Sequence, residues 1–160
     1  MWTIAEVHHP AGGQLLQHDH AAMTVEPLDG RRIEDVVGGQ RIAFDAPVPD
    51  AVHLFEYPRE RTNAPDRPYG GQHLVMSTGP TVEGPFDRVG TRSDMSRGVS
   101  GGPVFADFDP ATGTGTQIAV VSGHACEEHD DDGCTRESLE TSGVRFGAEA
   151  RRVHEAAASR

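Results

Sequence analysis

The serine at position 100 stands in the string Gly98-Val99-Ser100-Gly101-Gly102-Pro103, which places a hydroxyl group in a glycine-rich turn. A tight turn of this kind can aim several backbone N–H groups at one point. We expect the N–H groups of Gly98 and Ser100 to donate to the oxyanion that develops on a bound carbonyl. Ser100 would then be a nucleophile for acyl transfer. An ordinary glycine hairpin is the alternative interpretation of the Gly-x-Ser-Gly core taken alone.

Short apolar segments between turn signals surround this serine and predict an all-β fold. We expect strands at residues 21–25, 41–44, 52–57, 73–77, 103–108, 117–122 and 143–146. Glycine and proline pairs between them, such as Gly70-Gly71 and Gly79-Pro80, favour tight turns and therefore hairpins. Only the stretch 148–157 has helix-forming composition without a breaker, so it predicts one C-terminal helix.

Length and charge exclude several classes of protein. At 160 residues the chain has the size of one domain, which excludes a large multidomain enzyme. The formal net charge is −11 and the chain contains no lysine, so we expect no nucleic-acid partner. The longest apolar runs, such as 118–121, fall far short of the roughly 18 residues that a membrane span requires. We therefore expect no membrane partner either.

The full string around Ser100 resembles the nucleophile loop of chymotrypsin-like serine peptidases. Further segments look like the second β-barrel of secreted bacterial trypsin-like peptidases, especially actinobacterial ones: 52–58, 69–74, 93–95, 120–123 and 146–147, followed by a terminal helix. The resemblance runs from about residue 15 to about residue 155. It implies a chymotrypsin-like double β-barrel, with residues 1–47 as a partial first barrel and residues 48–160 as the complete second barrel with the helix.

The same resemblance implies a function. The chain would be a serine endopeptidase homologue that hydrolyses peptide bonds through an acyl-enzyme on Ser100. Its partner would be a peptide or protein substrate, its location extracellular, and it would need no cofactor and no metal ion.

A serine nucleophile needs a base and an orienting carboxylate, which in this family follow the chain order His, Asp, Ser. The segment 18–25 resembles the strand entry that carries the triad aspartate, which makes Asp19 the expected orienting carboxylate. His20 departs from the family here, because relatives carry an apolar or aromatic residue at that position. The competing interpretation of Asp19 is a solvated acid at the start of a strand.

No histidine of this chain matches the triad histidine. In the family it stands in an Ala-Ala-His-Cys type motif well before the aspartate, and nothing in residues 1–18 matches that motif or a secretory signal. We expect either that the sequence begins downstream of the natural N-terminus or that it is a genuine remnant. In both cases the chain alone should be weakly active, and a non-catalytic protein that binds peptide is the alternative function.

Further residues near the nucleophile carry expectations about activation and specificity. Val99 stands where animal trypsins have the acid that pairs with a new N-terminus, so that activation switch cannot operate. Ser96 replaces a cysteine, so the flanking disulfide is absent. Asp94 occupies the floor position of the primary specificity pocket and would select Arg or Lys, unless it is only a loop acid. Ser122 and Gly123 resemble the strand that lines the same pocket.

Two cysteines and a histidine pair suggest other kinds of site. Cys126 and Cys134 lie in an expected loop, where they would form either a local disulfide or two reduced thiols. Their single spacing lacks the paired short intervals of zinc sites. His18 and His20 alternate, so on a strand both rings would face one side and could bind a metal with His8 or His9. Surface or strand histidines are the favoured interpretation, and an all-β domain without any site is the remaining alternative.

Overall fold

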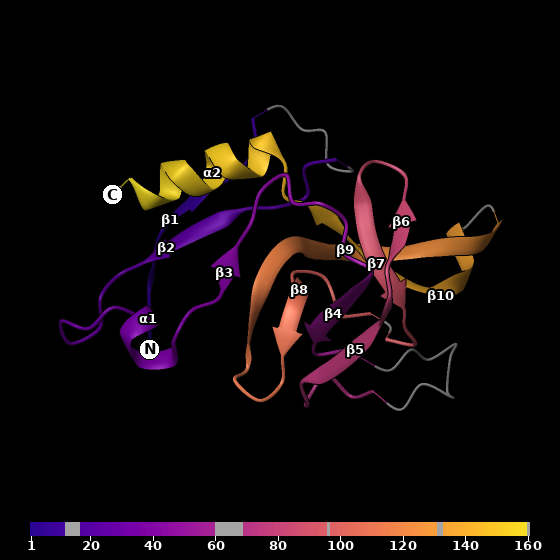
Figure 1. Ribbon diagram of the computed structural model, residues 1–160, viewed down its shortest axis with the longest axis horizontal. Helices are drawn as coiled ribbons and strands as arrows, with labels where there is room; N and C mark the ends of the chain where they lie inside the picture. The colour runs from indigo at the N-terminus through magenta and orange to yellow at the C-terminus, as the bar shows by residue number, and fades with distance from the viewer. Residues whose placement is uncertain (12–16, 60–68, 96, 131–132, 160) are drawn as a thin grey trace.

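The computed structural model describes residues 1–11, 17–59, 69–95, 97–130 and 133–159 (Figure 1). Most of this chain forms one curled antiparallel sheet of eight strands. Its members are β3 (Arg41–Ile42), β4 (Ala51–Glu56), β5 (Val75–Pro80), β6 (Val82–Gly84), β7 (Arg88–Arg92), β8 (Pro103–Asp109), β9 (Thr114–Asp130) and β10 (Gly133–Arg145). The strand order is β5-β4-β8-β9-β10-β7-β6, and β3 adds a short parallel pairing to β9.

The two ends of this strand order approach each other, which gives the sheet the shape of a half-barrel. The Thr91 hydroxyl on β7 donates a hydrogen bond of 2.9 Å to the carbonyl of Pro80 at the end of β5. A Cβ at Gly79 of β5 would lie only 2.7 Å from the Thr91 hydroxyl oxygen, so a residue without a side chain permits this approach. The sheet therefore curls around its own inner face.

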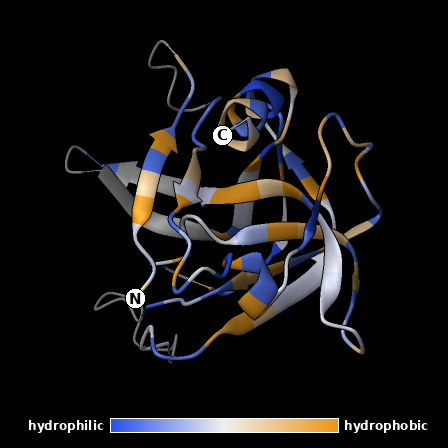
Figure 2. Cartoon of the chain, turned by 90° about the vertical axis from the view of Figure 1, so that its left-hand side faces the viewer, coloured by the Kyte–Doolittle hydropathy of each residue, from blue (hydrophilic) through white to orange (hydrophobic). Residues whose placement is uncertain are grey.

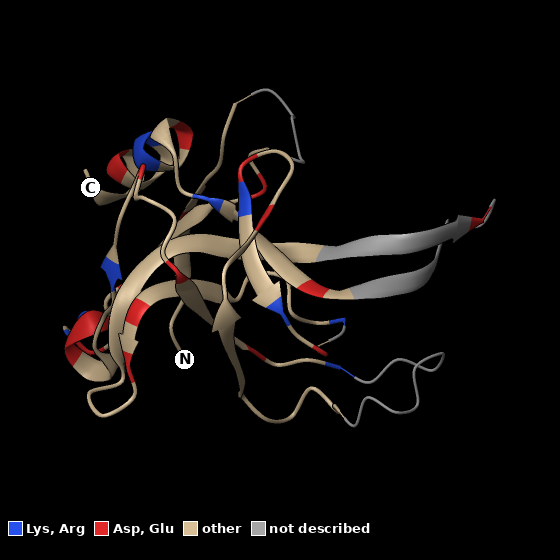
Figure 3. Ribbon diagram, turned by 45° about the vertical axis from the view of Figure 1, so that its right-hand side comes forward, with Lys and Arg blue, Asp and Glu red and all other residues tan. Residues whose placement is uncertain are grey.

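Alternation along the strands fills the inner face with apolar side chains. On β4 every second residue is buried, and Val52 and Leu54 have no exposed surface. The core that they join also contains Val89, Met95, Val99, Val104, Ala106, Ile118, Ala119 and Val121. Charged residues gather instead on the helices, the turns and the strand ends (Figure 3). Figure 2 shows the same division, with the hydrophobic colour concentrated in the strands that cross the middle of the view.

A smaller sheet lies beside the half-barrel. Strand β1 (Ile4–His8) pairs antiparallel with β2 (Ala22–Val25), and a short helix α1 (Glu34–Val37) follows before β3. The C-terminal helix α2 (Ala148–Ala158) packs against both β1 and β2 (Figure 1) and buries Ala150 and Val153. The N-terminal strand and the C-terminal helix therefore lie side by side in this part of the molecule. In the described residues no helix is both long enough and apolar enough to cross a membrane.

The all-β prediction with a C-terminal helix is confirmed, whereas the expected loop around the cysteines is wrong. Strands β9 and β10 continue through this region as one long hairpin. The sequence pattern does not predict these strands, because the residues there are mostly polar and give no apolar alternation. In the backbone register Cys126 lies opposite Glu137 and Cys134 lies opposite His129. The two cysteine side chains lie outside the described residues, so their disulfide stays a prediction. The division into residues 1–47 and 48–160 also stays a prediction.

Candidate active site

The turn that carries Ser100 is clamped between β4 and β9. The N–H of Gly102 donates to the carbonyl of Val99 at 3.2 Å and closes the turn. Gly101 donates to the carbonyl of Val121 at 2.9 Å, and Val121 donates back to Gly102 at 2.8 Å. Val99 is buried in the core while Ser100 is exposed, so the turn holds the hydroxyl at the surface on a fixed base.

The backbone of this turn leaves donors available beside Ser100. Gly98 and Gly101 have φ values of 93° and 92°, a conformation that L side chains rarely adopt. A Cβ at Gly98 would also lie 3.0 Å from the carbonyl oxygen of Tyr57. Among the hydrogen bonds between described residues, none uses the N–H of Gly98 or of Ser100. Both groups are free to donate to a bound carbonyl, and their joint role as an oxyanion hole stays a prediction.

Asp19 lies in a hydrogen-bonded chain that leads to the same turn. Its Oδ2 accepts a hydrogen bond of 2.6 Å from the Ser122 hydroxyl, which in turn accepts one of 3.0 Å from Arg88 Nη2. Ser122 directly follows Val121, the residue that is bound to Gly101 and Gly102. Strand β9 therefore brings Asp19, Ser122 and the turn of Ser100 to one region, although they are far apart in sequence.

The histidines next to Asp19 lie in a different environment. The rings of His18 and His20 are 6.2 Å apart and edge-on, and His20 packs against Phe146 with ring centroids 6.4 Å apart. Both rings line a cavity of about 460 Å³ between Phe86 and α2. Burial lowers the pKa of His20, His18 lowers it further, and Asp19 acts in the opposite direction. Neither ring nitrogen of His20 has a hydrogen-bond partner among the described residues.

The residue expected at the floor of a basic specificity pocket lies on the surface. Asp94 is exposed and its Oδ1 accepts a hydrogen bond of 2.6 Å from the Tyr69 hydroxyl. Asp94 does not line the cavity that contains Ser100. Gly123, the residue after Ser122 in β9, has a φ of 130°. The roles of Asp94, Ser122 and Gly123 in binding substrate stay predictions.

Sequence reasoning missed Glu56, a buried carboxyl beside the turn. Glu56 is 2% exposed, and neither carboxyl oxygen has a hydrogen-bond partner among the described residues. A Cβ at Gly102 would lie 2.5 Å from Glu56 Cγ, so the side chain packs directly against the turn. Burial raises the pKa of Glu56 to about 8. The period of two in β4 was the available signal, because it puts residue 56 on the inner face with Val52 and Leu54.

A cavity of about 710 Å³ opens at Ser100. It is lined by Gln40, Phe55, Glu56, Tyr57, Leu74, Gly98, Val99, Ser100, Gly101, Gly102, Pro103, Phe105, Phe108 and Gly113. No histidine is among these described residues, so the hydroxyl of Ser100 has no imidazole in its own cavity. The described residues of this cavity supply the Ser100 hydroxyl, two unused N–H groups and the buried carboxyl group of Glu56.

The fold of this chain recurs in solved bacterial proteases. The chain matches the protease Anisep from Arthrobacter nicotinovorans with a TM-score of 0.79 and 24% identity, over 99% of this chain and 68% of that one. The match to the thermostable serine protease AL20 from an extremophilic microorganism has a TM-score of 0.78 and 24% identity, over 99% of this chain and 68% of that one. The match to a Glu endopeptidase solved in complex with MPD has a TM-score of 0.62 and 13% identity, over 99% of this chain and 65% of that one. The chain has the fold of chymotrypsin-like serine proteases.

The expected resemblance is thus confirmed at the level of fold, and the chain is a protein of peptidase fold. No protein-family model and no curated protein sequence matches the chain.

Proposed function

We propose that this chain carries the nucleophile half of a serine endopeptidase site. Ser100 attacks the carbonyl carbon of a peptide bond, and the N–H groups of Gly98 and Ser100 stabilise the oxyanion. Asp19 is placed to orient a general base, which the described residues around Ser100 do not supply. The observation that supports this proposal is the exposed Ser100 with unused N–H donors, linked through Val121 and Ser122 to Asp19.

The missing base sets the expected level of activity. A serine hydroxyl is almost fully protonated at neutral pH and is a weak nucleophile unless an adjacent base removes its proton. No histidine among the described residues lines the cavity of Ser100. The chain by itself is therefore impaired as a peptidase, and this same observation favours a second function, binding of peptide without cleavage. Both functions imply a peptide or protein partner, and we propose an extracellular setting for them.

Labelling with a serine-directed fluorophosphonate tests the nucleophile. We expect labelling of the wild-type chain that is several orders of magnitude slower than that of a complete-triad protease assayed in parallel. Mass spectrometry should locate the adduct on Ser100, Ser100→Ala should abolish it, and Ser159→Ala at the exposed end of α2 should leave it unchanged.

Two other outcomes would change the conclusion. Rapid labelling would contradict the absence of a base and would show that an imidazole such as His18 or His20 reaches Ser100. Labelling no greater than that of Ser100→Ala, together with retained peptide binding, would replace the peptidase by the binding protein.

A further inference from the structure

The cavity at Ser100 continues as a groove over the outer face of the sheet. Phe55 alternates with the buried Leu54 and Glu56 along β4, so its side chain lies on the side away from the core, and the exposed Tyr57 follows directly after this strand. Phe105 and Phe108 of β8 and Leu74 before β5 complete the walls. We call this the aromatic groove: Phe55, Tyr57, Leu74, Phe105 and Phe108, together with the turn at Ser100.

The three phenylalanine rings of the groove contact one another. The centroids of Phe55 and Phe108 are 4.6 Å apart, those of Phe55 and Phe105 are 5.8 Å apart, and those of Phe105 and Phe108 are 5.7 Å apart. Tyr57 and Leu74 are 53% and 55% exposed, so the groove presents apolar surface to solvent. Its volume of about 710 Å³ falls within the range of roughly 300 to 1,000 Å³ that is common for ligand pockets.

Few polar groups line the groove. Ser100 and the N–H groups of Gly98 and Ser100 have no acceptor among the described residues. The Gln40 amide is already engaged, because its Nε2 donates to the carbonyl of Gly113 at 2.9 Å and its Oε1 accepts from the N–H of Gly115 at 2.8 Å. The single acidic or basic residue of the described lining is Glu56, whose carboxyl oxygens are buried.

We propose that the aromatic groove determines substrate selection, by binding a peptide whose large apolar side chain lies close to the carbonyl held at Ser100. The class of occupant rests on the proposed function, because the groove is continuous with the nucleophile turn, whose unused N–H groups can donate to a backbone carbonyl. An Arg, Lys, Glu or Asp side chain would lose hydration among the phenylalanine rings without gaining a partner. The groove thus selects Phe, Leu or Trp, whereas Asp94 with its Tyr69 partner lies outside it.

Equilibrium binding of peptides tests the groove without requiring catalysis. Fluorescently labelled Ala-Ala-Phe-Ala-Ala, blocked at both ends, is compared with its Arg and Glu counterparts on the Ser100→Ala protein by anisotropy. We expect the Phe peptide to bind about 10-fold or more tightly than either charged peptide, since burying an aromatic side chain is favourable and burying an unpaired charge is not.

Variants of the groove identify the residues responsible. Phe108→Ala should weaken binding of the Phe peptide by about 10-fold. Leu74→Ser changes an exposed wall residue and should weaken it several-fold without affecting the core, so the test stands even if Phe108→Ala fails to fold. Phe86→Ala is the matched control, because Phe86 is 51% exposed and lies outside the groove. It should leave binding unchanged.

The outcomes separate the groove from the proposed function. Preference for the Phe peptide that is lost in Leu74→Ser supports the groove even if the fluorophosphonate never labels Ser100. Equal binding of the three peptides, tighter binding of the Arg peptide, or a Phe preference that survives Leu74→Ser overturns the groove even if Ser100 is labelled.

Discussion

Glu56 carries a carboxyl group in a buried environment that opposes its ionisation. Its carboxyl group is buried with no hydrogen-bond partner among the described residues. Ionising a carboxyl group in such a place costs free energy, because the charge is removed from water without a partner. The group therefore stays protonated in the folded protein up to a pKa of about 8, against an ordinary value of 4.5. In the unfolded chain the same carboxyl loses its proton near that ordinary value. Between these two pH values the folded protein therefore keeps a proton that the unfolded chain has already released.

The stability of the protein should fall as pH rises from about 4.5 to about 8 because of Glu56. The unfolded state binds fewer protons in this window, so each pH unit lowers the free energy of unfolding by about 1.4 kcal/mol. The full effect is on the order of 4 to 5 kcal/mol and is reached above pH 8. Glu56→Gln should remove this slope, as measured by urea unfolding at pH 5, 6.5 and 8.

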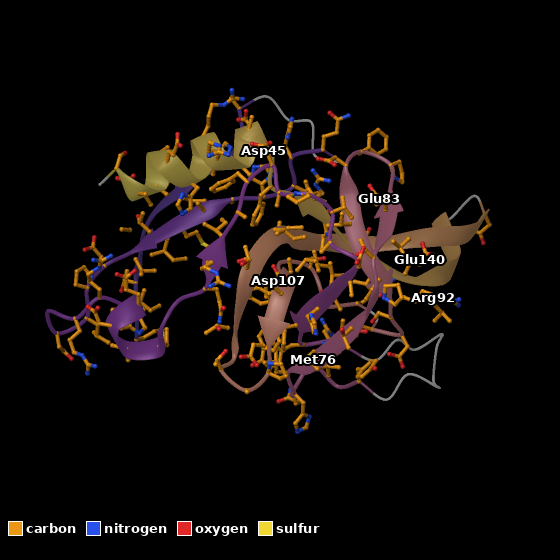
Figure 4. The ribbon with its side chains drawn as sticks, viewed as in Figure 1. Asp45, Met76, Glu83, Arg92, Asp107 and Glu140 are labelled. Carbon is orange, nitrogen blue, oxygen red and sulfur yellow. The ribbon has the colours of Figure 1, made fainter. Side chains whose placement is uncertain are left out.

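The matched control for this measurement is Glu83→Gln, an exposed carboxyl on β6 (Figure 4). It should retain the wild-type slope. A Glu56→Gln protein whose stability still falls between pH 5 and pH 8 like the wild type would show that Glu56 is not the group responsible.

At the scale of elements, β10 lies between β7 and β9 with almost no space at two glycines. A Cβ at Gly90 would overlap the carbonyl oxygen of Thr141, and a Cβ at Gly143 would lie 2.5 Å from the carbonyl oxygen of Val120. These neighbours are backbone atoms, so they cannot move away by changing a rotamer. The close pairing of the three strands therefore depends on glycine at both positions.

Gly143→Ala should lower the free energy of unfolding by about 1 to 3 kcal/mol, the usual cost of an added group in a packed interior. Gly39→Ala is the control, because a Cβ at Gly39 meets nothing within 4 Å. Equilibrium urea unfolding of both variants measures the difference. Equal stability of the two variants would show that β10 can shift away from β9 at no cost.

The elements and the site differ in how far the sequence predicts them. Apolar alternation predicts β4, β8 and the first part of β9, because their inner residues are buried in one core. It misses β7, where Gly90 and Thr91 are buried without being apolar, and the polar hairpin beyond Ser122. At the site, glycine spacing predicts the turn of Ser100. The burial of Glu56 and the aromatic groove depend on strand pairing across the sheet, which no local pattern reveals.

At the scale of the whole molecule, the described residues cover the small sheet on one face only. Helix α2 packs on β1 and β2, whereas Val7 and Met23, which are paired in register, are 56% and 59% exposed. Ile4 on β1 and Val37 on α1 are 54% and 72% exposed. A two-stranded sheet is marginally stable by itself and offers open edges to other chains. The small sheet is therefore stabilised on one face by α2, and its exposed apolar side chains favour association.

Replacing the outward apolar pair should reduce association without weakening the fold. In the double variant Val7→Thr, Met23→Thr we expect less binding of the dye ANS and less self-association at high concentration, measured by light scattering. Because both side chains are exposed, the free energy of unfolding should change by no more than about 0.5 kcal/mol. Val153→Thr, on the buried side of α2, should instead lower stability by more than 1 kcal/mol, as roughly expected for a polar group placed in a packed interior. If the double variant lost stability as Val153→Thr does, Val7 and Met23 would be part of the core rather than of an open surface.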